Sequence, residues 1–273
     1  MSKLKIQEYE IYYEVKGNVH AAETIVFLNG VMASASSWHY QIKALEKQYR
    51  IICQDFKGQL LSDKPAGPYT FAQHAADVIA LLDHLGLEKV HLAGTSYGGE
   101  VAMKLAILYP ARVKTITVID SVSELDELLK ANIHHWKSLA SKAKTPQTKK
   151  DFFYGMLPSI YGASFVKEQR ALLDVRAEAT SNMDDSYFEG QMQLYETFLT
   201  DVIMTDELHH ITCPALIVVG ENDYLKPVKF SRLIHEKIKD SEFVIVPNCG
   251  HVLIFERYQE LNTLLLGFIG KHA

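Results

Sequence analysis

The chain has 273 residues, of which 48% are hydrophobic, 10% aromatic and 22% charged, and its formal net charge is −5. This composition excludes collagen-like, disulfide-stapled and disordered chains, and it supplies enough apolar mass for a large buried core. A mildly acidic chain without a Lys/Arg cluster is not typical of a protein that binds the phosphate backbone of nucleic acids.

In chain order, the first half alternates short β-branched runs with longer stretches of helical period, which predicts an α/β sheet. Strands are expected at residues 8–14, 24–28, 49–54, 90–93 and 113–119. Helices are expected between them at residues 37–47, 69–85 and 98–109. The runs 24–28 and 113–119 are mostly apolar rather than alternating, which is typical of strands buried on both faces of a parallel sheet.

The pattern changes after Asp120, because residues 121–210 contain no strand-like run and their apolar residues recur at helical spacing. Further elements are expected at 215–219 (strand), 228–239 (helix), 243–246 (strand) and 261–269 (amphipathic helix). We therefore expect an α/β core formed by residues 1–120 and 211–273. Residues 121–210 should form a helical cap over the strand ends where ligands usually bind.

The sequence also bears on compartment. The first ten residues lack the apolar centre of a secretory signal, and no run approaches the roughly 18 apolar residues that cross a bilayer. Cys53, Cys213 and Cys249 are far apart and form no CxxC pair, which is typical of a reduced protein without disulfides. These features predict a cytoplasmic protein with no membrane span, and they say nothing about its oligomeric state.

Cofactor-binding patterns are missing from the sequence. Neither G-x-G-x-x-G nor G-x-x-x-x-G-K-[ST] occurs, so we expect no dinucleotide or nucleoside triphosphate. The adjacent pairs His134–His135 and His209–His210 lack the i, i+4 spacing of zinc ligands on a helix. We therefore expect no cofactor and no metal, and a small molecule as the partner.

The strongest motif is GTSYG at residues 94–98, which matches G-x-S-x-G. An apolar strand precedes it and a helix follows it, and this strand–turn–helix setting is that of a nucleophile elbow. The flanking glycines let strand and helix approach each other closely, and the hydroxyl of Ser96 then lies at a helix N-terminus. Ser96 is therefore the candidate nucleophile.

A serine nucleophile needs a base, and the base needs an orienting carboxylate, in the chain order Ser, Asp or Glu, His. Asp223 follows the predicted strand at 215–220, and His251 follows the next strand. Because parallel strands deliver their carboxyl ends to one edge of the sheet, we expect both side chains to meet Ser96 there.

Five segments carry a likeness to a known family: LNG at 28–30, DFKGQLLSDKP at 55–65, GTSYGG at 94–99, GENDYLKP at 220–227 and NCGH at 248–251. Through them the chain resembles the α/β-hydrolase superfamily over essentially its whole length. The resemblance implies an α/β-hydrolase fold, with a mostly parallel central sheet flanked by helices and a helical cap insertion. The chain departs from the usual pattern at Asn29, where the superfamily usually has His, and within 55–62, where it usually has D-x-R-G-x-G-x-S.

The resemblance also implies roles for individual residues. Ser96 would be the nucleophile, His251 the base and Asp223 the orienting acid. The backbone N–H groups of Val31 and Tyr97 would form the oxyanion hole.

Other residues compete for these roles. Asp120 is the alternative acid, since some superfamily members use that position, or it caps a helix or a strand-end turn. Cys249 precedes His251 by two residues and could be imagined as a thiol nucleophile, although packing is the favoured interpretation. For Asp55 and Ser62 we favour a role in ordering their loop.

Aromatic residues are dense in the predicted cap. They either build its own core and its seat on the sheet, or in part line an apolar acyl pocket. They include Trp136, Phe152, Phe153, Tyr154, Tyr161, Phe165, Tyr187, Phe188, Tyr195 and Phe198.

The favoured function is that of a cofactor-free serine hydrolase that cleaves a carboxylic ester or lactone through an acyl-enzyme. A second hypothesis is acyl transfer to a hydroxyl, because residues 26–34 resemble the corresponding segment of the bacterial acyltransferases that join two 3-hydroxyacyl units for rhamnolipid synthesis. A third hypothesis is a non-catalytic ligand-binding protein that keeps the hydrolase scaffold and senses a ligand with its cap, a plan that some plant hormone receptors resemble. The serine at the elbow argues against haloalkane dehalogenase and epoxide hydrolase chemistry, because the resemblance to the superfamily implies an Asp nucleophile at this position for those reactions.

Overall fold

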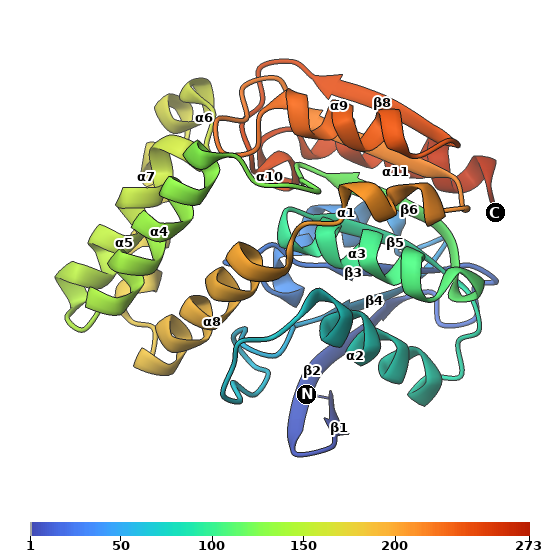
Figure 1. Cartoon of the computed structure of the whole chain (residues 1–273), viewed down its shortest axis with the longest axis horizontal. Coiled ribbons are helices and arrows are strands. Elements are labelled where there is room, and N and C mark those ends of the chain that lie inside the picture. The colour runs from blue at the N-terminus through green and yellow to red at the C-terminus, as the bar shows by residue number, and fades with distance from the viewer. Residues whose placement is uncertain (1) are drawn as a thin grey trace.

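The computed structural model describes residues 2–273, whose centre is an eight-stranded sheet with helices on both faces (Figure 1). The strands are β1 (Ser2–Ile6), β2 (Tyr9–Gly17), β3 (Thr24–Leu28), β4 (Arg50–Gln54), β5 (Val90–Thr95), β6 (Val113–Ile119), β7 (Ala215–Gly220) and β8 (Ser241–Val246). Their order across the sheet is β1-β2-β4-β3-β5-β6-β7-β8. The β1–β2 and β2–β4 pairs are antiparallel and all the others are parallel. The predicted α/β class with a mostly parallel sheet is confirmed.

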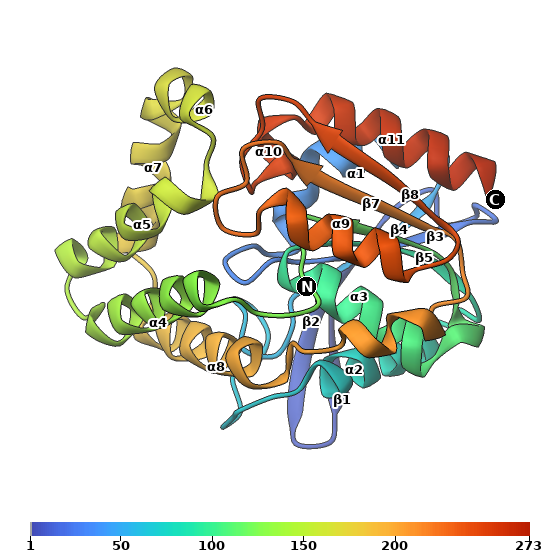
Figure 2. The same ribbon diagram turned by 45° about the horizontal axis from the view of Figure 1, so that its top comes forward.

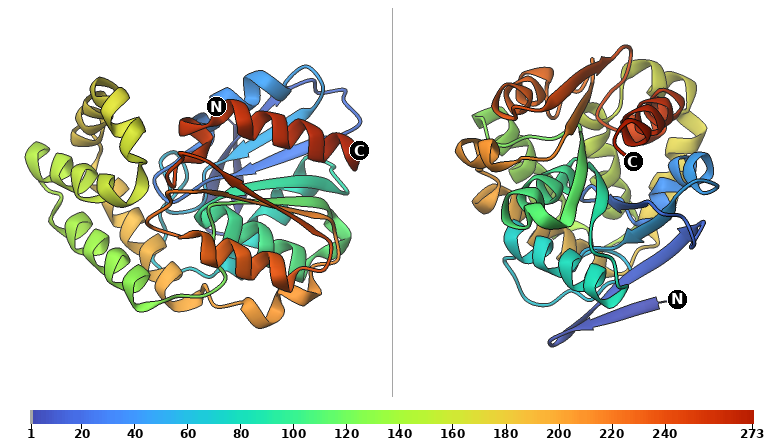
Figure 3. Two further views of the ribbon diagram at one scale, coloured as in Figure 1. Left: turned by 90° about the horizontal axis from the view of Figure 1, so that it is seen from above. Right: turned by 90° about the vertical axis from the view of Figure 1, so that its right-hand side faces the viewer.

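The α-helices are α1 (His39–Leu45), α2 (Phe71–His84), α3 (Tyr97–Leu108), α4 (Glu127–Lys142), α5 (Pro146–Ile160), α6 (Ala163–Glu168), α7 (Arg170–Ser181), α8 (Asp185–Asp201), α9 (Val228–Lys237), α10 (Leu253–Glu256) and α11 (Tyr258–Lys271). Short 3-10 turns are η1 (Ala35–Trp38), η2 (Pro110–Arg112) and η3 (Thr205–His210). Helices α2, α3 and α9 cover one face of the sheet, and α1 and α11 cover the other (Figure 3). Within residues 2–273, no helix has both the length and the apolar content that a bilayer crossing requires.

The apolar run of β3 shows why the sheet is buried on both faces. Ile25 and Phe27 pack on the side of α1 and α11, whereas Val26 and Leu28 pack on the side of α2 and α3. All four side chains are fully buried. Because successive side chains of a strand point to opposite faces, a continuous apolar run is stable only when helices cover both.

The N-terminal edge of the sheet differs from the prediction. The first strand was expected at 8–14, but the chain forms a hairpin in which β1 precedes β2 and Gln7 adopts a positive φ of 52° at the turn. β1 lies at the edge of the sheet and its side chains are exposed or half-buried. Such a strand is held by backbone pairing to β2, so its sequence carries little apolar signal.

Helices α4–α8 are inserted between β6 and β7 and gather beside one end of the sheet (Figures 1 and 2). Within this helical insertion α4 packs on α5 and α8, and α5 packs on α7. Helix α8 is fixed to the core, because the Tyr69 backbone N–H donates to Thr197 Oγ1 at 3.0 Å. A side chain at Gly190 would overlap the carbonyl of Gly58, so this glycine permits the close approach of α8 to the loop after β4. The insertion is thereby held against the strand ends.

Candidate active site

The GTSYG motif forms the sharp turn between β5 and α3. Ser96 has φ 52° and ψ −120°, in a region that non-glycine residues rarely occupy. A side chain at Gly94 would overlap the carbonyl of Gly98, and one at Gly98 would overlap the carbonyl of Leu28. The Ser121 hydroxyl donates to the Ser96 carbonyl at 2.9 Å and braces the turn from the end of β6. Both glycines are therefore required by the approach of strand and helix.

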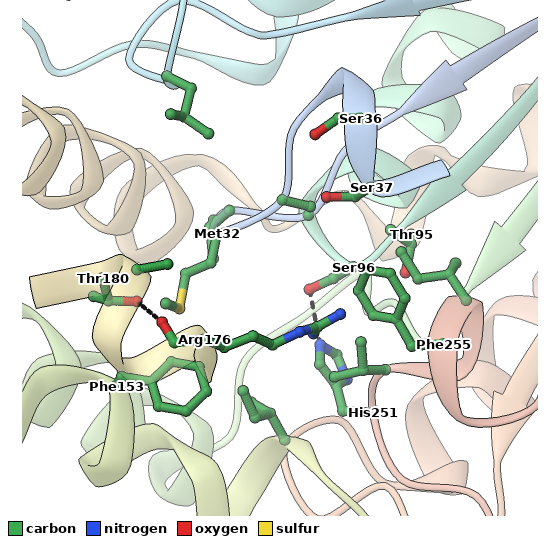
Figure 4. Close-up of a pocket in the computed structure, with 18 of the residues that line it drawn as sticks. Met32, Ser36, Ser37, Thr95, Ser96, Phe153, Arg176, Thr180, His251 and Phe255 are labelled. Carbon is green, nitrogen blue, oxygen red and sulfur yellow. Dashed lines mark hydrogen bonds between the residues drawn. The ribbon is translucent and has the colours of Figure 1, made fainter. Parts of the chain in front are cut away.

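Ser96, His251 and Asp223 lie in one hydrogen-bonded chain at the carboxyl edge of the sheet. The distance from Ser96 Oγ to His251 Nε2 is 3.0 Å (Figure 4), and the distance from His251 Nδ1 to Asp223 Oδ2 is 2.7 Å. Asp223 Oδ1 accepts the backbone N–H groups of Leu225 and Lys226 at 2.9 and 2.8 Å. These two bonds fix the carboxylate, which in turn fixes the orientation of the imidazole.

Asp120, the alternative acid, is placed differently. It follows β6 with a positive φ of 50°, is fully buried, and accepts the backbone N–H of Gly220 at 2.9 Å. Within the described chain its carboxyl makes no hydrogen bond to His251. Burial and the neighbouring charge of Asp223 raise the pKa of Asp120 well above its ordinary value. The structure thus gives the imidazole contact to Asp223, and Asp120 ties β6 to β7.

The two backbone N–H groups expected to form an oxyanion hole belong to segments next to Ser96. Val31 follows β3, and Tyr97 is the first residue of α3. Neither N–H donates a hydrogen bond to any acceptor in residues 2–273. A β-carbon at Gly30 would lie 3.4 Å from Ser96 Cβ, so the loop after β3 passes directly beside the serine. Two donors without a protein acceptor next to a candidate nucleophile are what an oxyanion requires.

The loop after β3 is anchored by amide side chains. Asn29 is fully buried, its Nδ2 donates to the Gln54 carbonyl at 2.6 Å, and its Oδ1 accepts the Trp38 indole N–H at 2.8 Å. Gln59 Nε2 donates to the Gly30 carbonyl at 2.7 Å. Asn29 is therefore held by its own hydrogen bonds at the position where the superfamily usually has His. Gln59 could not be recognised from the sequence, because it stands at a variable position of the D-x-R-G-x-G-x-S pattern and acts through contacts with a distant segment.

Asp55 and Ser62 order the next loop along the chain. Asp55 Oδ1 accepts the Ala35 backbone N–H at 2.7 Å, and Oδ2 accepts that of Leu61 at 3.1 Å. The Ser62 hydroxyl donates to the Asp55 carbonyl at 2.6 Å. These contacts agree with the structural role that we favoured for both residues.

A cavity of about 370 Å³ lies between the helical insertion and the sheet, and both Ser96 and His251 line it (Figure 4). Its wall is mostly apolar. Aromatic residues of the insertion that line the cavity are Trp136, Phe153, Tyr161 and Tyr187. Phe152, Phe188 and Tyr195 do not line the cavity and are fully buried in the hydrophobic cluster that joins the insertion to the core. The aromatic residues are thus divided between packing and the pocket, and a small organic molecule fits such a cavity.

Cys249 is not available as a nucleophile. It is fully buried, its Sγ lies 3.4 Å from the Gly250 carbonyl oxygen, and burial raises the pKa of its thiol. We expect iodoacetamide at pH 8 to leave Cys249 unmodified in the folded protein and to modify it in urea, because only an exposed thiolate reacts. Peptide mass spectrometry checks this result, and modification of folded Cys249 with parallel loss of activity would contradict it.

A buried ion pair lies beneath the site. Lys226 Nζ lies 2.8 Å from Glu100 Oε1, and the two side chains are 2% and 0% exposed. Glu100 is in the first turn of α3, and Lys226 is in the loop that carries Asp223. The pair therefore joins the acid loop to the helix that follows Ser96. No local pattern in the sequence indicates this pair, because its two residues lie far apart in the chain.

We expect Lys226→Met to lower the free energy of unfolding at pH 8 by about 3–5 kcal/mol, because it leaves a buried carboxylate uncompensated. Burial already raises the pKa of Glu100. A carboxyl whose pKa is raised on folding destabilises the folded state as pH rises, so the loss should be smaller at pH 5. Urea unfolding measures both values. Glu100→Gln combined with Lys226→Met should recover most of the loss, and equal losses in the single and double variants would contradict the assignment.

Known proteins similar to this chain agree with its architecture. The family model described as alpha/beta hydrolase fold matches residues 23–258. A protein named "Putative carbamate hydrolase RutD" from Azorhizobium caulinodans is 28% identical over 267 residues, which cover 96% of each chain. The "3-oxoadipate enol-lactonase 2" of Acinetobacter baylyi is 25% identical over 263 residues, which cover 95% of this chain and 92% of the relative.

A solved structure is also similar over nearly the whole chain. The α/β-hydrolase enzyme MGS-M2, from a Medee basin deep-sea metagenome library, has a TM-score of 0.91 and 27% identity. The match covers 98% of this chain and 97% of that one. Because the family model covers most of the sequence, the chain belongs to the α/β-hydrolase fold family.

Proposed function

We propose that this protein is a cofactor-free serine hydrolase that cleaves a carboxylic ester or a lactone. Ser96 is the nucleophile, His251 the general base and Asp223 the acid that orients the imidazole. The backbone N–H groups of Val31 and Tyr97 bind the oxyanion. Residues 121–210 act as a cap that closes the substrate cavity.

The reaction divides into acylation and deacylation. His251 Nε2 takes the proton of the Ser96 hydroxyl as Oγ attacks the acyl carbon, and the carbonyl oxygen becomes an oxyanion bound by Val31 and Tyr97. The oxyanion collapses, the bond to the leaving oxygen breaks, and His251 returns the proton to that oxygen. Water then attacks the acyl-enzyme by the same route, which frees the carboxylic acid and restores Ser96.

One observation carries this proposal: the hydrogen-bonded chain from Ser96 through His251 to Asp223 opens onto a cavity of about 370 Å³. Nucleophile, base, acid and oxyanion donors are all supplied by the protein, so the chemistry needs no added group. Membership of the α/β-hydrolase family supports a hydrolase. Two relatives are named as a putative carbamate hydrolase and an enol-lactonase. A carbamate and a lactone are therefore suitable test substrates beside simple esters.

Hydrolysis of p-nitrophenyl esters with acyl chains of two to twelve carbons tests the proposal, with a lactone and a carbamate measured in parallel. Steady turnover that stays linear after the first equivalent of p-nitrophenol supports a hydrolase and ranks acyl length. A burst of one equivalent that then stalls would favour acyl transfer to a missing hydroxyl acceptor. If no substrate gives a burst or turnover, that result would contradict both the hydrolase and the acyltransferase hypotheses and would favour the non-catalytic binding protein.

A further inference from the structure

The charges of the cavity are asymmetric. Arg176 is the one Lys or Arg side chain that lines it in the described chain, and no Asp or Glu of residues 2–273 lines it. Arg176 belongs to α7 of the helical insertion, whereas Ser96 and His251 come from the core. Figure 4 shows the Arg176 side chain extending into the cavity on the side where Ser96 and His251 lie. The substrate cavity thus carries a fixed positive charge with no negative charge in its wall.

The guanidinium of Arg176 is held in place without a counter-ion. One amino group, Nη1, donates to the Tyr161 hydroxyl at 2.8 Å, and the guanidinium carbon lies 4.1 Å from the centre of the Phe255 ring. Among residues 2–273, no carboxylate lies within 4.0 Å of it. Glu256, the residue that follows Phe255 in the chain, accepts hydrogen bonds from the backbone N–H groups of Gly162 and Gly250 instead. The other N–H donors of Arg176 have no protein acceptor in the described chain.

A half-buried cation in an apolar wall is costly unless an anion joins it. A guanidinium offers a planar pair of N–H donors that fits a carboxylate in a bidentate arrangement. Tyr161 accepts a hydrogen bond from the guanidinium, and the Phe255 ring packs against it. Because the group is already ordered, less entropy is lost when an anion binds. These are the properties of a preformed carboxylate site.

On these grounds, and resting on the proposed hydrolase function, we infer that the substrate is an ester or lactone that carries a free carboxylate, which Arg176 binds. Arg176 is then the specificity-determining residue. It selects anionic over neutral substrates and places the scissile carbonyl at Ser96.

Two matched pairs of esters test this inference. Monomethyl glutarate and methyl pentanoate differ only by a carboxylate in place of a methyl group on the acyl side. The ester 4-acetoxybutanoate and butyl acetate differ in the same way on the alcohol side. For at least one pair the wild-type protein should hydrolyse the anionic ester with a kcat/KM at least about tenfold above that of the neutral ester, the gain expected of one charge-assisted bidentate contact.

Arg176→Met should reduce that preference by about 10- to 100-fold, because it removes the charge and keeps the length of the side chain. Most of the change should appear in KM for the anionic ester. Arg176→Lys restores the charge without the planar fork and should recover part of the preference. Arg170→Met is the matched control, since Arg170 lies on the same helix, pairs with Asp174 and does not line the cavity. It should leave the preference unchanged.

Three outcomes would overturn the inference. They are no preference of the wild type for the anionic ester, a loss of kcat/KM in Arg176→Met that is equal for the anionic and the neutral ester, and a loss of preference in Arg170→Met as large as that in Arg176→Met. Equal loss would mean that Arg176 only holds Tyr161 and Phe255 in place. A binding measurement separates this failure from failure of the hydrolase proposal. Calorimetry with glutarate and the Ser96→Ala protein should detect binding that Arg176→Met weakens at least about tenfold. Absence of that difference would contradict the inference even if no ester is turned over.

Discussion

Replacing Ser96 with alanine is expected to lower kcat by a factor on the order of 10⁴ to 10⁶, because no other group can form the acyl-enzyme. The Ser96 hydroxyl is in hydrogen-bond distance of His251 Nε2, and the elbow holds it at the cavity wall. Alanine removes one oxygen and leaves the strained turn, the flanking glycines and the cavity in place. The loss should therefore fall on kcat, with substrate binding retained. Initial rates on the best p-nitrophenyl ester measure it.

Ser231→Ala provides the matched control for this variant. Ser231 is a fully buried serine on α9 that does not line the cavity, and its hydroxyl has no hydrogen-bond partner in the described chain. Removing this hydroxyl should leave both kcat and the melting temperature close to those of the wild type. Residual activity of Ser96→Ala within about tenfold of the wild type would contradict the assignment of the nucleophile, provided that its melting temperature is unchanged.

The second large effect is expected for Asp223→Asn, which should lower kcat by about 10⁴ with little change in fold. Asp223 Oδ2 accepts a hydrogen bond from the N–H of His251 Nδ1, and this bond selects the tautomer whose unprotonated Nε2 faces Ser96. An asparagine amide can donate to Nδ1 and thereby stabilise the tautomer in which Nε2 carries the proton. The imidazole then has no lone pair directed at the serine. Kinetics and the unfolding free energy of the variant test both parts.

Asp120→Asn distinguishes the two candidate acids. Burial and the charge of Asp223 raise the pKa of Asp120 well above its usual value, so replacing this carboxyl with a neutral amide should cost little. Asparagine keeps the acceptor for the Gly220 N–H and removes no bond to His251. We expect kcat to fall by less than about tenfold. A large loss in Asp120→Asn together with a small loss in Asp223→Asn would exchange the roles of the two residues.

The structure brings together Ser96, Asp223 and His251, the three residues that local sequence patterns selected, and there is a physical reason for it. Ser96 lies in a turn that only its glycine neighbours permit, so the motif specifies the backbone. Asp223 and His251 directly follow parallel strands that pair with each other, and parallel pairing brings their ends to one edge. The parallel arrangement of the strands is therefore enough to predict that the three residues lie close together. The hydrogen bonds between them could be found only in the structure.

The residues that shape the pocket could not be predicted in this way. Arg176 lies on a helix of the insertion, where a pattern of helical period assigns a charged residue to the solvent side. Its place in the cavity depends on how α7 packs against α5 and on the position of Phe255, which is far away in the sequence. Gln59 and the Lys226–Glu100 pair were missed for the same reason. Each acts through contacts between segments that the sequence does not relate.

The most direct test of the central claim is the mass of the intact protein after reaction with an alkyl fluorophosphonate. Such a reagent transfers its phosphonyl group to an activated serine oxygen and releases fluoride. The account predicts one adduct per chain, located on Ser96 by peptide mapping, and no adduct in Ser96→Ala. No adduct on the folded wild-type protein, or an adduct on another residue that persists in Ser96→Ala, would contradict the proposal that Ser96 is the nucleophile.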